Sequence, residues 1–162
     1  MHPIVILQLS VLLLLANGTP VIAKKFLGDL YSYPLDGNLT FADRRPVFGR
    51  SKTIRGIVLA VLVTTAGAPL LGLGWETGLL VGSFAMAGDL FSSFCKRRLN
   101  LPPSSRASGL DQIPESLLPL LACRDALALT TADIVAGVVV FVIGEVVLSR
   151  LLYSLRLRDR PY

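Results

Sequence analysis

Residues 57–95, IVLAVLVTTAGAPLLGLGWETGLLVGSFAMAGDLFSSFC, are the stretch that decides the fold class. They contain two apolar runs, 57–74 and 78–95, and Asp89 is the only charged residue within either run. A helix that crosses the hydrocarbon core of a bilayer needs about 20 residues, with a range of roughly 17–25. Both runs have that length, so this stretch predicts two membrane-spanning helices joined by a short turn.

Three more apolar runs lie outside this stretch, at residues 3–21, 113–130 and 134–152. Hydrophobic residues make up 52% of the 162 residues and charged residues 17%, whereas a soluble domain carries about 25% charge. A chain this apolar does not remain disordered in water. It is also too short to bury so much apolar surface in a soluble globular domain. We therefore predict an all-α fold: a polytopic membrane helix bundle of about five transmembrane helices, forming a single integral membrane domain over residues 1–162.

The charges test this span count. The net charge is +5, and the basic residues fall after the first, third and fifth runs. With five spans, every basic residue except Arg124 lies on one side of the membrane, which is the cytoplasmic side by the positive-inside rule. We therefore expect a protein of the cytoplasmic membrane, with its N-terminus outside, its C-terminus in the cytoplasm and a long basic cytoplasmic loop after the first span. The alternative, a signal peptide cleaved after residues 21–23, lacks a basic start and would turn that loop outward.

Asp89 is the first candidate functional residue, because an ionisable group within a span is expensive to keep there. At 100° per residue, Ser93 and Lys96 lie about 40° and 20° around the helix from Asp89, and Arg97 about 80°. Asp89 and Lys96 are about 10 Å apart along the axis, too far for an ion pair but suited to a ligand or metal–phosphate complex between them. In the alternative interpretation, Asp89 bonds a neighbouring helix and the cations anchor the membrane edge.

The loop after the first span is the second candidate. Seven basic residues between Lys24 and Arg55 alternate with Gly, Ser and Thr. Arg and Lys match the charge of a polyphosphate, and backbone N–H groups can fill the gaps between them. The alternative is that this loop binds only anionic lipid head groups. Residues 49–53, GRSKT, lack the glycine spacing of a P-loop.

Asp111 and Glu115 are the third candidate, at the start of the fourth run. Their i, i+4 spacing places two carboxylates on one helical face, and Pro114 suits the first turn of a helix. Carboxylates there can also simply complement the helix dipole. All three candidates lie at the same predicted membrane boundary, which favours a functional role.

Together these motifs resemble the CDP-archaeol synthase family, small five-span relatives of the CDP-diacylglycerol synthases. The resemblance covers most of the chain and rests on the segments 17–20 (NGTP), 34–36 (PLD), 43–45 (DRR), 48–56 (FGRSKTIRG), 88–98 (GDLFSSFCKRR) and 110–112 (LDQ). One position departs from the family pattern: a second Asp usually stands where this chain has Pro114, and the adjacent Glu115 is the candidate substitute.

The resemblance implies transfer of a cytidylyl group from CTP to a lipid phosphate with Mg²⁺, which gives a CDP-lipid and pyrophosphate. On this basis Asp89, Lys96 and Asp111 are the expected catalytic residues, and Asp89, Asp111 and Glu115 the expected metal ligands. The expected substrate-binding residues are Asn17, Asp36, Arg45, Lys52, Arg55, Ser93 and Arg97. The expected partners are CTP, an archaetidic-type or phosphatidic acid and the membrane, with no nucleic acid.

Two other function classes stay open at this point. A non-catalytic membrane protein would use the basic segments only to bind anionic lipid head groups. A small anion transporter would line a path with Asp89, Arg124 and Glu145, and would need polar residues through the whole membrane. The sequence leaves open ether or ester linkage of the acceptor, the number of metal ions and the oligomeric state.

Overall fold

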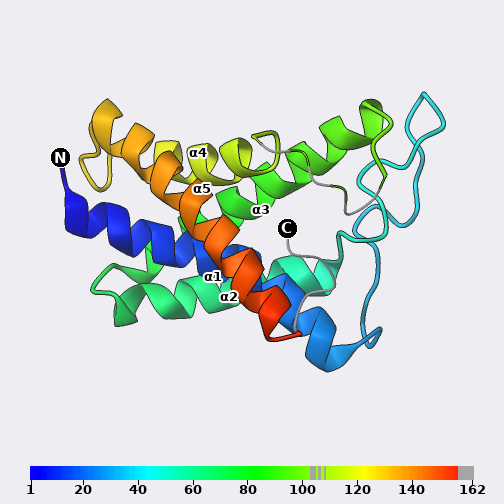
Figure 1. Ribbon diagram of the computed structural model, residues 1–162, viewed down its shortest axis with the longest axis horizontal. Coiled ribbons are helices and arrows are strands. Elements are labelled where there is room, and N and C mark those ends of the chain that lie inside the picture. Colours follow the sequence, from blue (N-terminus) through cyan, green and yellow to red (C-terminus); the bar gives the residue numbers. More distant parts are fainter. Residues whose placement is uncertain (103–104, 106, 108, 157–162) are drawn as a thin grey trace.

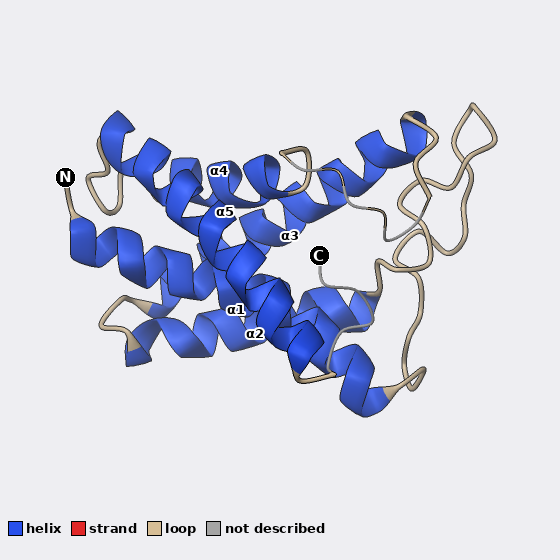
Figure 2. Cartoon of the chain, viewed as in Figure 1, coloured by secondary structure: helices blue, strands red, loops and turns tan. Residues whose placement is uncertain are grey.

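The described part of the chain folds into five α-helices joined by loops (Figures 1 and 2). The computed structural model describes residues 1–102, 105, 107 and 109–156, and over these residues it contains isolated β-bridges but no strand. The helices are α1 (Pro3–Leu27), α2 (Ile54–Leu70), α3 (Trp75–Arg98), α4 (Gln112–Ala122) and α5 (Thr131–Ser154). The predicted all-α bundle is confirmed.

Three of the helices, α1, α3 and α5, are long and apolar enough to cross a membrane. They have 25, 24 and 24 residues, and the apolar helix α2 has 17. Pro3 stands in the first turn of α1, where its missing N–H is harmless. Thr53 caps α2 by accepting the N–H of Gly56, and Thr130 forms a capping box with Asp133 at the start of α5.

The fourth helix is shorter than the sequence predicts. α4 ends at Ala122 rather than near residue 130, and its 11 residues span about 16 Å, about half the hydrocarbon core. After Ala122 the chain turns, and Ala128 adopts a left-handed conformation with φ 49°. Arg124 and Asp125 are exposed in this turn, at an end of the bundle. Both charges are therefore open to solvent rather than buried among the helices.

The packing leaves one pair of long helices apart. α2 packs on α1 and α3, α4 packs on α3, and α5 packs on α1 and α4. The Cα atoms of α3 and α5 nowhere approach within 8 Å. The shared core consists mainly of residues from α1, α3 and α5, among them Leu9, Leu12, Leu13, Val81, Ala85 and Phe141, each at most 1% exposed.

Successive helices run in opposite directions, so the bundle has two distinct ends (Figure 1). At one end the His2 N–H donates to Asp133 Oδ1 at 2.7 Å, which ties the N-terminus to the start of α5. The other end carries the loop of residues 28–53, called here the basic loop, together with the C-terminal ends of α1, α3 and α5. Among the described residues, every Lys and Arg except Arg124 lies toward this second end. That clustering is the one predicted from five alternating segments.

Candidate active site

A cavity of about 520 Å³ opens at the end of the bundle that carries the basic loop. Its wall comes from α1, the basic loop, the first turn of α2, the second half of α3, the start of α4 and the second half of α5. Eight basic side chains line it, Lys24, Lys25, Arg50, Lys52, Arg55, Lys96, Arg97 and Arg150, with four acidic ones, Asp89, Asp111, Glu115 and Glu145. If all are ionised, the cavity carries a formal surplus of four positive charges.

Asp89 forms an ion pair with Lys52 of the basic loop. The Lys52 ammonium lies 2.5 Å from both carboxylate oxygens of Asp89, and each side chain is about one-fifth exposed, 21% and 22%. Burial opposes charge on Lys52, but the charge and hydrogen bonds of Asp89, together with the charges of Glu115 and Asp111, outweigh it and raise the pKa of Lys52. Lys52 therefore stays an ammonium, held against both oxygens of one carboxylate.

Asp111 and Lys96 form the second ion pair of the cavity. The Lys96 Nζ lies 2.6 Å from Asp111 Oδ1 and also donates to the Ser105 carbonyl at 3.2 Å. Glu115, on the first turn of α4, lines the same cavity. The three acids expected from the sequence therefore line one cavity, two of them paired with lysines.

Gly88 brings α4 against α3 beside Asp89. A Cβ at this position would lie 2.3 Å from the Pro114 carbonyl oxygen and 2.7 Å from the Glu115 nitrogen, so only glycine allows the contact. Ser92 donates to the Gly88 carbonyl at 2.9 Å and lies 3.5 Å from the Asp111 carbonyl. The small residues around Asp89 therefore set the distance between the carboxyl groups of α3 and α4.

The ends of the basic loop are paired, which fixes the position of Lys52. The Leu35 N–H donates to the Lys52 carbonyl at 2.8 Å, and the Ile54 N–H donates to the Tyr33 carbonyl at 3.1 Å. Arg55, one residue further on, donates to the carbonyls of Gly28 and Leu30. Lys52 thus projects from a fixed backbone rather than from a free loop.

Asp36 organises the basic loop and does not line the cavity. Its carboxylate accepts the N–H groups of Asn38 at 3.1 Å and of Phe48 and Gly49 at 2.9 Å. Burial raises the pKa of Asp36, but these three N–H donors outweigh burial, so the pKa lies below its ordinary value. This carboxylate is already occupied by the backbone.

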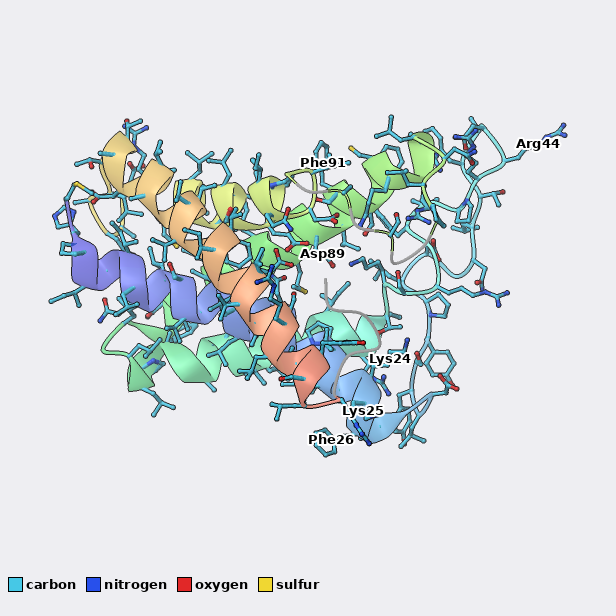
Figure 3. All side chains as sticks on the ribbon, viewed as in Figure 1. Lys24, Lys25, Phe26, Arg44, Asp89 and Phe91 are labelled. Carbon is cyan, nitrogen blue, oxygen red and sulfur yellow. The ribbon has the colours of Figure 1, made fainter. Side chains whose placement is uncertain are left out.

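Arg45 and Arg98 fasten the basic loop to the end of α3, outside the cavity lining. Arg45 donates to the Arg98 carbonyl at 2.8 Å. The Arg98 guanidinium lies 4.8 Å and 4.9 Å from the ring centroids of Phe41 and Phe94 and pairs with Asp43 at 3.2 Å. Figure 3 shows the contrast within the loop, since Arg44 projects from its outer tip while Asp89 lies near the middle of the molecule.

Most of the residues expected from the sequence share the cavity: Asn17, Lys52, Arg55, Asp89, Ser93, Lys96, Arg97, Asp111 and Glu115. Asp36 and Arg45 lie in the loop contacts described above. Asn17 is notable because its Nδ2 is buried and has no hydrogen-bond partner among the described residues. A buried donor of this kind suits a ligand acceptor.

Sequence reasoning left several lining residues out of the site, including Gln112, Glu145, Ser149 and Arg150. Glu145 carried a signal, because it is an acid within an apolar run. Arg150 gave no such signal, because basic residues are common at the cytoplasmic ends of membrane spans. Its place in the cavity depends on how α5 crosses the bundle.

The donor set also fits a divalent metal ion. Carboxylate oxygens are the ligands that Mg²⁺ prefers, and Mg²⁺ is usually held by one or two carboxylates plus substrate phosphates. Asp89, Asp111 and Glu115 supply such oxygens within one cavity. Over the described residues there is no cluster of three or more His, Cys, Asp or Glu ready to hold a metal by itself.

Known proteins similar to this chain share its size and architecture. A family model for CarS-like CDP-archaeol synthase matches residues 71–162. The chain is 31% identical over 152 residues to the CDP-archaeol synthase of Pyrobaculum islandicum, covering 91% of each protein. It is also 31% identical to that of Sulfurisphaera tokodaii, covering 92% of this chain and 90% of the relative, and 42% identical over 107 residues to that of Pyrococcus furiosus, covering 60% of each.

The fold is also similar to a solved structure, described as that of an intramembrane enzyme for archaeal membrane lipid biosynthesis. The TM-score is 0.73 at 25% sequence identity, covering 87% of this chain and 90% of the other. The similarity therefore includes the whole bundle and not only the C-terminal half that the family model matches.

Proposed function

The chain belongs to the CDP-archaeol synthase family of membrane-embedded enzymes that form CDP-lipids, and on that premise we propose that it transfers the cytidylyl group of CTP to a lipid phosphate and releases pyrophosphate. The observation that carries the proposal is the cavity at the basic end, where Asp89, Asp111 and Glu115 lie among eight cations. A triphosphate needs such a positive surplus, and a metal ion that accompanies it needs the acids.

The proposed reaction is a displacement at phosphorus. An oxygen of the lipid phosphate forms a bond to the α-phosphorus of CTP, while the bond from that phosphorus to the bridging oxygen breaks. Pyrophosphate leaves with the electron pair of the broken bond. Because the substrate supplies the nucleophile, the protein contributes positioning and charge neutralisation rather than covalent chemistry.

The cations of the cavity divide between the two substrates in this proposal. Lys52 and Arg55, at the junction of the basic loop and α2, bind the triphosphate. Lys96 and Arg97, on α3, bind the lipid phosphate and the α-phosphate, with Ser93 as a nearby hydroxyl donor. The Asn17 amide binds the nucleotide end. Asp36 and Arg45 act through the basic loop, since they hold it in place without lining the cavity.

Mg²⁺ bound by Asp89 and Asp111, with Glu115 as a further ligand, would offset negative charge on the phosphates. In the proposal Glu115 takes the place of the second acid that Pro114 displaces from the family pattern, because Glu115 lines the cavity together with Asp89 and Asp111.

We also propose a route for the lipid tails. Leu148 of α5 faces Gly18 of α1, at 3.8 Å from where a Cβ would stand. Val146 and Arg150 lie about 160° around α5 from Leu148, yet they also line the cavity. The cavity therefore extends around α5 to the side away from α1, toward the space between α3 and α5. We place the tails there and the basic end on the cytoplasmic side, as the positive-inside rule requires.

The test is an assay with purified protein, labelled CTP, Mg²⁺ and either archaetidic or phosphatidic acid. We expect labelled CDP-lipid, with archaetidic acid the better acceptor, and loss of at least about 100-fold of turnover in Asp89→Asn. The matched control is Asp125→Asn, which changes an exposed acid at the opposite end of the bundle. Absence of labelled product with both acceptors would refute the cytidylyltransferase proposal.

Among the other function classes, the transporter lacks support from the cavity. Its lining includes Asp89 and Glu145 but not Arg124, which lies in the exposed turn at the opposite end. If the protein only bound lipid, neither the parent protein nor Asp89→Asn would form CDP-lipid. The same assay detects this outcome.

A further inference from the structure

Lys52 and Lys96 hold the two carboxylates that the proposed function assigns to the metal. The Lys52 Nζ lies 2.5 Å from both oxygens of Asp89, and the Lys96 Nζ lies 2.6 Å from one oxygen of Asp111. A cation bound by both oxygens of Asp89 would need the place of the Lys52 ammonium. The charge of each of these two carboxylates is therefore already balanced by a lysine of the chain.

The net charge of the whole cavity also opposes binding of a free cation. Its eight basic and four acidic side chains already give a positive surplus. A free divalent cation would add two positive charges to that surplus and also compete with two ammonium groups. A triphosphate does the opposite, because it lowers the surplus and offers both lysines a new anionic partner.

We propose that Lys52 and Lys96 act as exchangeable counter-ions, so that a divalent cation binds this cavity only together with a nucleotide triphosphate. The inference rests on the proposed function and adds an order to it. When the triphosphate attracts the two ammonium groups, the Asp89 and Asp111 carboxylates become available, and the cation binds between them and the phosphates. Lysine suits this exchange because its ammonium sits on a flexible stem and carries three rotatable donors.

Binding linkage makes the proposal quantitative. If CTP raises the affinity for the cation by some factor, the cation must raise the affinity for CTP by the same factor. The probe is Mn²⁺, whose free concentration is read by electron paramagnetic resonance in detergent-solubilised full-length protein. No lipid acceptor is present, so CTP is not consumed. We expect Mn²⁺ to bind at least about 10-fold more tightly with CTP than without it, within the usual range of coupling between sites.

Lys52→Gln is the critical variant. It removes the counter-ion of Asp89, so Mn²⁺ should bind several-fold more tightly than in the parent protein when CTP is absent, and the enhancement by CTP should shrink. The matched control is Lys25→Gln, which removes the same charge from the same cavity wall. Lys25 is exposed and has no ion-pair partner among the described residues. Lys96→Gln, which frees Asp111 instead, repeats the test if Lys52→Gln does not fold.

The outcomes separate this inference from the function on which it rests. CTP binding with a Mn²⁺ affinity that is the same with and without CTP would overturn only the inference. So would a Lys25→Gln variant that tightens Mn²⁺ binding as much as Lys52→Gln. Failure of CTP to bind even in the presence of Mn²⁺ would instead contradict the proposed cytidylyltransferase activity.

Discussion

Asp36 and Asp89 are both acids next to basic segments, but their surroundings give them different roles. Asp36 accepts three backbone N–H groups within its own loop, so its charge is balanced by local dipoles. Asp89 pairs instead with the side chain of Lys52, which can move. A carboxylate satisfied by the backbone stabilises a fold, whereas one satisfied by flexible side chains can exchange its partners.

The role of Asp36 predicts an acid-sensitive loop. Its pKa lies below the ordinary value of 3.8, so the carboxylate stabilises the fold fully above that pH. The stabilisation is lost as the pH falls through the lowered pKa. At pH 7, Asp36→Asn should destabilise the loop by about 1–3 kcal/mol, because an amide group would face N–H donors. Protease cleavage of the basic loop at pH 7 and pH 3 measures this.

The control for Asp36 is Asp29→Asn, an exposed acid of the same loop. It should leave the cleavage rate unchanged at both values of pH. An Asp36→Asn protein that is as resistant as the parent at pH 7 would show that the three N–H contacts do not hold the loop.

For single residues, the sequence predicts the chemistry of the site better than it predicts which residues line the cavity. Asp89, Lys96 and Asp111 stand out because charges are costly within apolar runs. Asp36 and Arg45 stand in the same kind of basic segment as Lys52, so residue type alone cannot separate loop contacts from cavity lining. The separation depends on the fold of residues 28–53, where irregular backbone gives no periodic signal.

Among the elements, α4 departs most from its predicted form. The apolar run of 113–130 has the composition of a span, but only Gln112–Ala122 is helical. Hydropathy over a window cannot show that Arg124 and Asp125 occupy an exposed turn. The long helices α1, α3 and α5 were predictable because each combines length with an almost uncharged run.

The contact of α4 with α3 predicts that Gly88→Ala is poorly tolerated. The new methyl group would meet backbone atoms of Pro114 and Glu115 at less than 3 Å, and backbone cannot move aside as a side chain can. Overpacking of this kind costs about 1–3 kcal/mol and should also shift Glu115 away from Asp89. We expect a lower melting temperature together with lower CDP-lipid formation.

Gly144→Ala is the matched substitution on α5. Its methyl group would approach only the flexible end of Leu14, at 3.3 Å, so its effect on both measurements should be small. Equal melting temperatures for Gly88→Ala and the parent protein would mean that α4 is not held against α3 as described.

The attachment of the basic loop to α3 gives a second prediction for the elements. Arg98→Lys keeps the charge but cannot match the planar contacts with Phe41 and Phe94 or the forked hydrogen bonds to the loop. Protease cleavage of the basic loop should become about 10-fold faster, equivalent to about 1.4 kcal/mol. Arg44→Lys, at the exposed tip of the loop (Figure 3), should have no effect. Equal cleavage of the two variants would contradict this role for Arg98.

At the scale of the whole molecule, α3 and α5 do not pack on each other, and α4 packs on both. Leu120 of α4 packs on Gly137, in the first half of α5. α4 runs back toward that half of α5, whereas the second halves of α3 and α5 both line the cavity. We propose that the bilayer reaches the cavity between these second halves, so that a lipid can present its phosphate without withdrawing its tails from the hydrocarbon layer.

A bulky side chain on the wall of this opening should obstruct the lipid and not the nucleotide. Val146→Trp should raise the KM for the lipid acceptor at least about 5-fold and leave CTP binding unchanged. Val147→Trp is the control, because Val147 is 60% exposed on the outer face of α5 and does not line the cavity. If both variants have the same KM for lipid, the acceptor does not pass between α3 and α5.

The two halves of α5 also differ in what surrounds them. Its first half is braced by α1, by Leu120 of α4 against Gly137, and by the capping contacts of Asp133 with His2 and Thr130, whereas six residues of its second half line the cavity. Residues beside a cavity have fewer packing contacts, so we expect thermal motion to be largest in the second half of α5. Amide hydrogens of residues 145–154 should therefore exchange with solvent deuterium sooner than those of residues 134–142. We therefore expect a rigid bundle at one end and a more mobile cavity wall at the other, on the side where we propose that the lipid binds.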